Sequence, residues 1–195
     1  DSPYPMLVLT GGDCFERPDL VDLIEYAVGK GLHVSISPSV TPLFTRERVK
    51  AVQDAGVSVM SMSLDGGSAE THDAFRGFPG TFDRTIEACH MLNELGMRFQ
   101  LNTVFTAKNI HEAPQMLKNA IDLGAFMFYT FMLVPTGRGQ HLDMLTPHER
   151  EDVLHWLHDN STRIAIKTTE APQYRRIAFQ REAVRQGKAA PATVS

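Results

Sequence analysis

The amino-acid sequence predicts an α/β chain built around a parallel β-sheet of at least five strands. One pattern occurs four times: a helical segment, a glycine, and then an apolar run that follows Gly31, Gly56, Gly96 or Gly124. Glycine at such a junction favours a left-handed helix end and a short connection into a strand. The apolar runs are rich in Val, Phe and Met and alternate little, which is typical of parallel strands covered on both faces. Strands that alternate with helices need crossovers, so the sheet is either open and doubly wound or a whole or partial barrel.

The expected elements begin with a strand over residues 6–10, which ends at two glycines and an acid. A helix follows, because apolar residues recur at helical offsets of 0, 3, 4, 7 and 8: Leu20, Leu23, Ile24, Ala27 and Val28. The four apolar runs after the glycines predict four more strands. A helix from Pro147 to about Asp159 is predicted by Thr146 and Glu149, which match the capping-box pattern.

A last strand is expected over residues 163–169. We expect one domain over residues 1–180, followed by a polar, Ala-rich tail over residues 181–195 that frays.

The composition limits the classes of function. The chain has 195 residues, of which 43% are hydrophobic, so it is long enough for the core of one domain. Its net charge of −4 disfavours binding to nucleic acid or to an anionic membrane. The longest apolar run, residues 126–134, is too short to span a bilayer, and no signal peptide is visible. The two cysteines, Cys14 and Cys89, form no disulfide framework, which favours a cytoplasmic setting.

Small and polar residues gather where the predicted strands end. The carboxyl ends of parallel strands meet at one rim, where ligands bind in α/β folds. Hydroxyls, an amide, glycines and carboxylates at this rim suit a polar small molecule with hydroxyl and amine groups. Neither a Walker loop nor a G-x-G-x-x-G turn follows a strand, which disfavours nucleoside-triphosphate and nicotinamide enzymes. The residues at the strand ends are Gly11, Gly12, Asp13, Ser35, Ser37, Ser39, Ser61, Ser63, Asp65, Asn102, Thr103 and residues 133–138.

Four motifs, in this order and at these distances, resemble the core of radical S-adenosylmethionine (radical SAM) enzymes: LTGGD with RPDL, then SISPS, MSLDG and LNTVF. The resemblance covers roughly residues 7–176. The stretches MSLDGGSAETHDAFRGFPGTFDRTIEA and KTTEAPQYRR are most similar to the SPASM-type branch, which has an extra iron–sulfur extension and includes haem-biosynthesis and peptide-modifying members. The resemblance implies a partial (β/α) TIM-like barrel of about five to six parallel strands, with the first strand and the cluster loop missing from this chain.

The resemblance also implies roles for the rim residues. In the family, the Gly-Gly-acid turn holds the ammonium group of S-adenosylmethionine, because glycine lets the backbone approach and an ionised acid pairs with an amine. Serines would bind its carboxylate and ribose, an asparagine the ribose, and backbone after a later strand the adenine. The implied cofactor-binding residues are Gly11, Gly12, Asp13, Ser35, Ser37, Ser63, Asn102 and Val134.

Five further residues are candidates for substrate contact, and no catalytic residue is identified. They lie in loops at strand ends or near the last strand: Asp65, Arg138, Lys167, Glu170 and Tyr174. Each has a structural alternative, since Asp-Gly is ordinary turn chemistry and a loop arginine needs no ligand. Four histidines, His141, His148, His155 and His158, are close in sequence, but no cysteine or close carboxylate completes a metal site.

The sequence departs from the family in two places. The family more often has Glu where this chain has Asp13, and Pro where it has Cys14. The Cys-x-x-x-Cys-x-x-Cys loop that ligates a 4Fe–4S cluster would precede Asp1, and the cysteines of a C-terminal extension are absent. Because three thiolates are needed to leave one iron open, we expect no metal ligands in this chain and no activity from it alone.

For a full-length parent protein, the resemblance implies an Fe–S oxidoreductase that cleaves S-adenosylmethionine reductively to a 5′-deoxyadenosyl radical. The substrate would be a tetrapyrrole or a peptide, and the reductant a protein such as a flavodoxin or ferredoxin. Two alternatives remain open: a (β/α)-barrel lyase or aldolase that uses Lys167 as a Schiff-base lysine, and a non-catalytic remnant that binds a ligand or partner. The exposed edge of the strand over residues 6–10 predicts either a marginally stable monomer or a dimer that forms through this edge.

Overall fold

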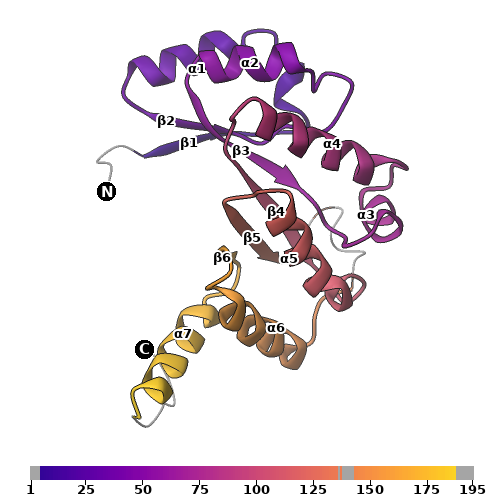
Figure 1. Cartoon of the computed structure of the whole chain (residues 1–195), viewed down its shortest axis with the longest axis vertical. Coiled ribbons are helices and arrows are strands. Elements are labelled where there is room, and N and C mark those ends of the chain that lie inside the picture. The colour runs from indigo at the N-terminus through magenta and orange to yellow at the C-terminus, as the bar shows by residue number, and fades with distance from the viewer. Residues whose placement is uncertain (1–4, 136, 138–142, 188–195) are drawn as a thin grey trace.

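The fold is a curled, six-stranded parallel sheet that forms half of a barrel (Figure 1). The computed structural model describes residues 5–135, 137 and 143–187. The strands lie side by side in chain order, which decides between the two predicted sheet types, because a doubly wound sheet reverses its strand order and a barrel does not. The strands are β1 (Met6–Leu9), β2 (His33–Ile36), β3 (Val57–Ser63), β4 (Phe99–Phe105), β5 (Met127–Met132) and β6 (Ala165–Thr169).

Helices cover the outer face of the curled sheet, and no helix of the described residues lies over the inner face (Figure 1). None of these helices is both long enough and apolar enough to cross a bilayer. The helices are α1 (Leu20–Gly29), α2 (Arg46–Asp54), α3 (Ala69–Arg76), α4 (Thr81–Glu94), α5 (Ala113–Asp122), α6 (Pro147–Asn160) and α7 (Gln173–Arg185), with short 3₁₀ turns η1 (Cys14–Glu16) and η2 (Ile110–Glu112).

The local signals read from the sequence place most of these elements correctly. Gly31, Gly56, Gly96 and Gly124 all have positive φ and each precedes a strand. Helix α6 begins at Pro147 and has the predicted capping box. Strand β6 begins two residues later than predicted, and helix α7 continues to Arg185, past the expected start of a frayed tail at residue 181. Residues 188–195 of that tail lie outside the described residues.

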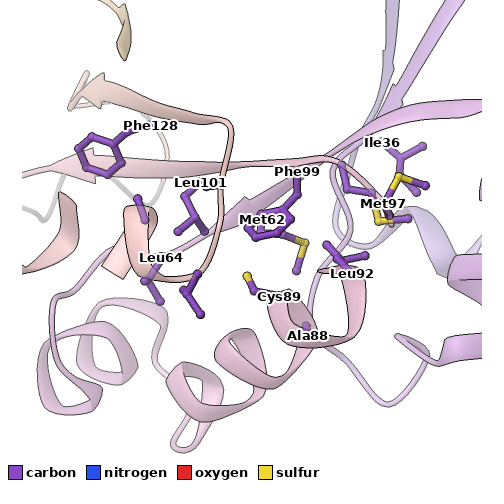
Figure 2. Close-up of a cluster of buried hydrophobic side chains, with 14 of the residues drawn as sticks. Ile36, Met62, Leu64, Ala88, Cys89, Leu92, Met97, Phe99, Leu101 and Phe128 are labelled. Atoms are coloured by element: carbon purple, nitrogen blue, oxygen red, sulfur yellow. The ribbon is translucent and has the colours of Figure 1, made fainter. Parts of the chain in front are cut away.

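The core lies between the sheet and its helices (Figure 2). Met62, Leu101 and Phe128 come from three adjacent strands and are each 1% exposed. Helix α4 contributes Cys89 and Leu92, whose exposed fraction is zero, to the same cluster. Burial in an apolar cluster raises the pKa of the Cys89 thiol to about 12, so this cysteine acts as a small hydrophobic residue.

The expectation that both faces of each strand are fully covered is wrong for β4 and β5. Both strands alternate strictly between buried and half-buried residues. The buried residues face the helices, and the half-buried ones, such as Asn102 and Tyr129, face the inside of the curl. The pattern was hidden because the inner-face residues of β5 are themselves large and apolar or aromatic: Met127, Tyr129 and Phe131.

The loop after β3 is held rigidly against α3 and η2. A Cβ atom on Gly66 would lie 2.4 Å from the backbone nitrogen of His72, so only glycine fits there. The backbone N–H of Asp65 donates to Nδ1 of His72 at 2.9 Å, and the amide of Asn109 donates to the carbonyl of Asp65 at 2.9 Å. Glu112 accepts hydrogen bonds from the backbone N–H of Gly67 and from the hydroxyls of Ser68 in this loop and Thr71 in the first turn of α3.

His72 makes the stability of this loop dependent on pH. It is 1% exposed, and burial, followed by the positive charge of Arg76, lowers its pKa from 6.5 to about 4. The neutral ring, which accepts the hydrogen bond from Asp65, is therefore the form that the folded state prefers.

We expect the free energy of unfolding to fall as the pH drops from 6.5 to 4, because the unfolded chain binds a proton at His72 before the folded chain does. The contribution is complete above pH 6.5, is lost below pH 4, and amounts to about 3 kcal/mol. Urea unfolding at several pH values tests this. A His72→Gln variant should flatten the profile between pH 6.5 and 5, whereas His90→Gln, which changes an exposed histidine of α4, should leave it unchanged. Equal profiles for the two variants would contradict this role for His72.

Candidate functional site

One row of side chains crosses four strands on the inner face of the sheet. The register pairs Ser63 of β3 with Asn102 of β4 and Asn102 with Tyr129 of β5. It then pairs Tyr129 with Lys167 of β6. Adjacent strands in register carry side chains of paired residues on the same face, so these four residues form a continuous strip. We call Ser63, Asn102, Tyr129 and Lys167 the inner-face row.

The chemistry of the inner face changes from β3 to β6. On the β3 and β4 side it is polar and uncharged: Ser63 is half-buried, and the amide of Gln100 donates to Oδ1 of Asn102 at 2.8 Å. On the β5 and β6 side it is aromatic and cationic. The ring centroids of Tyr129 and Phe131 lie 4.4 Å apart, and Nζ of Lys167 lies 4.7 Å from the Tyr129 ring centroid.

The turn that contains Gly11 and Gly12 follows the carboxyl end of β1. Gly11 has a φ of +151°, a conformation that disfavours residues with a side chain. A Cβ atom at Gly11 or Gly12 would meet no atom within 4 Å, so the backbone of this turn borders open space. Such a turn lets a ligand approach the backbone closely.

Asp13 links the loops that follow β1 and β2. Its side chain is largely buried, with 8% of the residue exposed. Oδ1 accepts from the backbone N–H of Phe15 at 3.1 Å and of Ser39 at 3.3 Å, and Oδ2 accepts from the hydroxyl of Thr41 at 2.6 Å. A carboxylate has about four lone-pair positions, so three of them are already used within the protein.

The serines near the end of β2 occupy two different environments. Ser35 is 3% exposed and pairs in register with Val8 and Val59, so it lies within the sheet. Ser37 is half-buried, and its backbone N–H donates to the carbonyl of Leu9 at 2.9 Å, which extends the pairing of β1 and β2. Ser39 lies beyond the strand, and its hydroxyl donates to the carbonyl of Gly12 at 2.7 Å.

Asp65 has a structural role and is not placed to contact a substrate. It is 1% exposed, its Oδ1 accepts from the backbone N–H of Val104 at 2.7 Å, and its Oδ2 lies 2.5 Å from the Arg76 guanidinium. Burial raises the pKa of this carboxyl, and the positive charge of Arg76 opposes the rise. Both oxygens are therefore used to join β4 and α3 to the end of β3.

The remaining predicted rim residues are only partly brought together. Val134, in the loop after β5, is 45% exposed. Glu170 follows β6, is exposed, and is the one non-glycine residue of the described chain with positive φ, at +59°. The Tyr174 ring packs against His158 of α6, with centroids 6.4 Å apart, so it belongs to the helix layer and not to the inner face. Arg138 lies outside the described residues.

Tyr129 was not recognised from the sequence as a site residue. It lies in the centre of an apolar run, AFMFYTFMLV, in which the alternation between faces is masked by aromatic residues on both sides. The structure shows that its hydroxyl shares a hydrogen bond of 2.5 Å with that of Thr169 on β6. Two assumptions would have placed Tyr129 on the inner face: that residues of this run alternate between the two faces, and that Tyr129 pairs with Lys167 on the next strand.

The described residues contain no site for a metal ion or cluster. No group of three His, Cys, Asp or Glu side chains is arranged to hold a metal within the described part of the chain. Cys14 and Cys89 are free and buried. Burial and the neighbouring Asp13 carboxylate raise the pKa of Cys14 to about 11, which disfavours the thiolate that an iron–sulfur cluster needs.

A hollow of about 330 Å³ lies on the helix side of the molecule, between α5 and α6. Its lining is mainly apolar and includes Ile110, Pro114, Val153 and Trp156. None of the strand-end residues lines it, so it is separate from the inner-face row.

Comparisons with known proteins found a matching family model and several relatives. The model of the Radical SAM superfamily matches residues 2–120. The AdoMet-dependent heme synthase of Methanosarcina barkeri is 40% identical over 178 residues, which cover 90% of this chain and 51% of that protein. The PqqA peptide cyclase of Methylocella silvestris is 32% identical over 117 residues, which cover 60% of this chain and 31% of that protein.

The fold also matches solved structures. The crystal structure of Streptococcus suis SuiB bound to S-adenosylmethionine has a TM-score of 0.72 and 13% identity, and covers 90% of this chain and 40% of that one. At this identity, the match supports the half-barrel fold alone. The chain spans about half the length of the curated relatives it matches.

We expect Asp13→Asn to lower the free energy of unfolding by about 2 kcal/mol, because the amide has one acceptor oxygen and cannot accept both the hydrogen bonds that Oδ1 accepts from Phe15 and Ser39 and the one that Oδ2 accepts from Thr41. Asp22→Asn, which changes an exposed acid on α1, is the matched control and should change stability by less than about 0.5 kcal/mol. Denaturant titration measures both variants. An Asp13→Asn variant as stable as the parent would show that this carboxylate does not hold the two loops together.

Proposed function

This chain belongs to the radical SAM superfamily, and from that premise we propose that its inner face and glycine turn bind S-adenosylmethionine. The single observation that carries the proposal is that Ser63, the last residue of β3, pairs in register with Asn102 of β4, while the open Gly11-Gly12 turn follows the end of β1 in the same parallel sheet. Bound there, S-adenosylmethionine would supply the reductive C–S bond cleavage that is characteristic of the family.

The open backbone of Gly11 and Gly12 suits the methionyl end of the ligand. Carbonyl oxygens of this turn and the one free lone-pair position of Asp13 are the acceptors available to an ammonium group. Asp13 would thus act mainly by holding Ser39 and Thr41 in place. The shorter side chain of aspartate suits this anchoring role, because it keeps the carboxylate close to its own loop.

The hydroxyl of Ser63 and the amide of Asn102 suit the ribose hydroxyls. The two residues are paired in register, and Gln100 orients the Asn102 side chain by donating to its Oδ1. With Oδ1 accepting that hydrogen bond, the Asn102 amide nitrogen is the group free to donate to a ligand. Val134 lies after β5, where its backbone would contact the adenine, and Ser35 and Ser37 would support the turn from β2.

The residues of this chain do not fit a 4Fe–4S cluster. Such a cluster needs three thiolates, and the chain has two cysteines, both buried and far apart in sequence. The cluster would have to be ligated by residues other than those of this chain.

For the substrate we propose a tetrapyrrole, since the relative with 40% identity is a heme synthase. A peptide is the second candidate, because another relative is a peptide cyclase.

We further propose a cytoplasmic setting and a protein reductant such as a flavodoxin or ferredoxin. We also propose that two copies pair through the edge of β1, where Met6 and Val8 are 58% and 48% exposed. The family match favours this function over a Schiff-base aldolase and a non-catalytic remnant.

The proposal is tested with the longest protein that the gene encodes, reconstituted with iron and sulfide without oxygen. We expect S-adenosylmethionine to bind and 5′-deoxyadenosine to form when dithionite is added. Ser63→Ala and Asn102→Ala should each weaken S-adenosylmethionine binding by about 5- to 10-fold, because each removes one hydrogen bond to the ligand.

Ser58→Ala is the matched control. Ser58 lies on the same strand as Ser63 but at the amino end, where its hydroxyl donates to the carbonyl of Val34 at 3.1 Å. If Ser63→Ala and Asn102→Ala bind S-adenosylmethionine as tightly as Ser58→Ala does, the assignment of Ser63 and Asn102 is wrong. A reconstituted protein that neither binds S-adenosylmethionine nor forms 5′-deoxyadenosine would overturn the proposed function itself.

A further inference from the structure

The described strands carry one positively charged residue and no negatively charged one. Across the six described strands, Lys167 is the only Asp, Glu, Lys or Arg residue. Of the carboxylates that follow the strands, Asp13 and Asp65 are buried in loop contacts, and Glu170, which follows β6, is exposed beyond the end of that strand. In a chain with a net charge of −4, this isolated cation makes the inner face suited to an anionic ligand.

The Lys167 side chain is positioned by an aromatic ring and not by a carboxylate. Its Nζ lies over the ring of Tyr129, whose hydroxyl is in turn bonded to that of Thr169 at 2.5 Å. Lys50, Lys108 and Lys118 all pair with carboxylates, whereas Lys167 has no carboxylate partner among the described residues. Its side chain is exposed on the inner face, so its charge remains available to a ligand.

Beside this charge lies a small aromatic surface. Tyr129 and Phe131 are both half-buried, their rings are tilted by 35°, and their centroids are 4.4 Å apart. Because the two residues are two positions apart on one strand, both rings lie on the inner face. Aromatic side chains arranged in this way favour contact with a flat conjugated ring.

We propose that Lys167, Tyr129 and Phe131 form a substrate subsite that binds a flat, carboxylate-bearing tetrapyrrole, with Lys167 as the residue that pairs with a carboxylate. This inference rests on the proposed function, because the subsite continues the inner-face row from the part assigned to S-adenosylmethionine. Tyr129 and Phe131 stack against the ring, and Lys167 fixes its orientation through one carboxylate. Lys167 is thus a binding residue that determines specificity.

Two features favour a tetrapyrrole over an extended peptide at this subsite. An extended peptide gains most of its affinity from an unpaired strand edge, whereas β5, which carries both aromatic rings, is paired on both sides; among the described strands the unpaired edge on this side belongs to β6, beyond Lys167. Charge and flat apolar surface are adjacent here, which matches a ring with carboxylates on its periphery. A single ammonium also suits a carboxylate better than a phosphate, which is usually bound by several donors.

The test measures binding of metal-free coproporphyrin III, a porphyrin with four carboxylates, by its fluorescence. Lys167→Met, which keeps length but removes charge, should weaken binding by about tenfold and reduce its dependence on salt. Lys167→Arg should restore binding to within about twofold, since it restores the charge. Tyr129→Leu should weaken binding by about 5- to 10-fold, because it removes one stacking face.

Lys118→Met is the matched control: Lys118 lies on α5, on the outer face, and pairs with Asp122. It should bind the porphyrin as the parent does. A tetracationic porphyrin should bind the parent more weakly than coproporphyrin III. Equal binding of coproporphyrin III by the parent and Lys167→Met, or displacement of the porphyrin by an extended peptide that binds in its place, would overturn the subsite.

Titration of the same reconstituted samples with S-adenosylmethionine separates the two proposals. If S-adenosylmethionine binds while the Lys167 variants leave porphyrin binding unchanged, the subsite is wrong and the proposed function stands. If S-adenosylmethionine does not bind, the proposed function fails irrespective of the porphyrin result.

Discussion

The parallel register of β3 to β6 is the constraint on which the rest of the site depends. Side chains alternate between the two faces of a strand, so the register that places Met62, Leu101 and Phe128 in the core also places Ser63, Asn102 and Tyr129 on the inner face. A slip of one residue would exchange these two sets and expose the core. Burial of the apolar set therefore fixes the polar set, and the positions of these inner-face side chains follow from the packing of the hydrophobic core.

The two acidic residues at the strand ends show how loops are fixed around this sheet. Asp13 joins the loops after β1 and β2, and Asp65 joins the end of β3 to β4 and α3. Because both carboxylates are used in this way, neither of them places a negative charge on the inner face. Lys167 of β6 is then the one charged residue of the described strands, and the proposed substrate subsite depends on its charge.

The sequence was sufficient to predict the α/β class, the glycine junctions and the capped start of α6, because these signals are local. Local signals could not distinguish a doubly wound sheet from a barrel, because strand order depends on contacts between residues far apart in the chain. The barrel was therefore predicted from the resemblance to the family. The partners of Asp13 and Asp65 show the same limit: Thr41 and Arg76 are 28 and 11 positions away, and no local pattern links them. Tyr129 was missed because aromatic residues on both faces of β5 concealed the alternation.

A structure of the protein determined with bound S-adenosylmethionine tests the central claim most directly. The half-barrel arrangement predicts that the ligand lies on the inner face, with its ribose beside Ser63 and Asn102 and its methionyl end against the Gly11-Gly12 turn. Ligand density elsewhere, for example in the hollow between α5 and α6, with the inner-face row unoccupied, would contradict it.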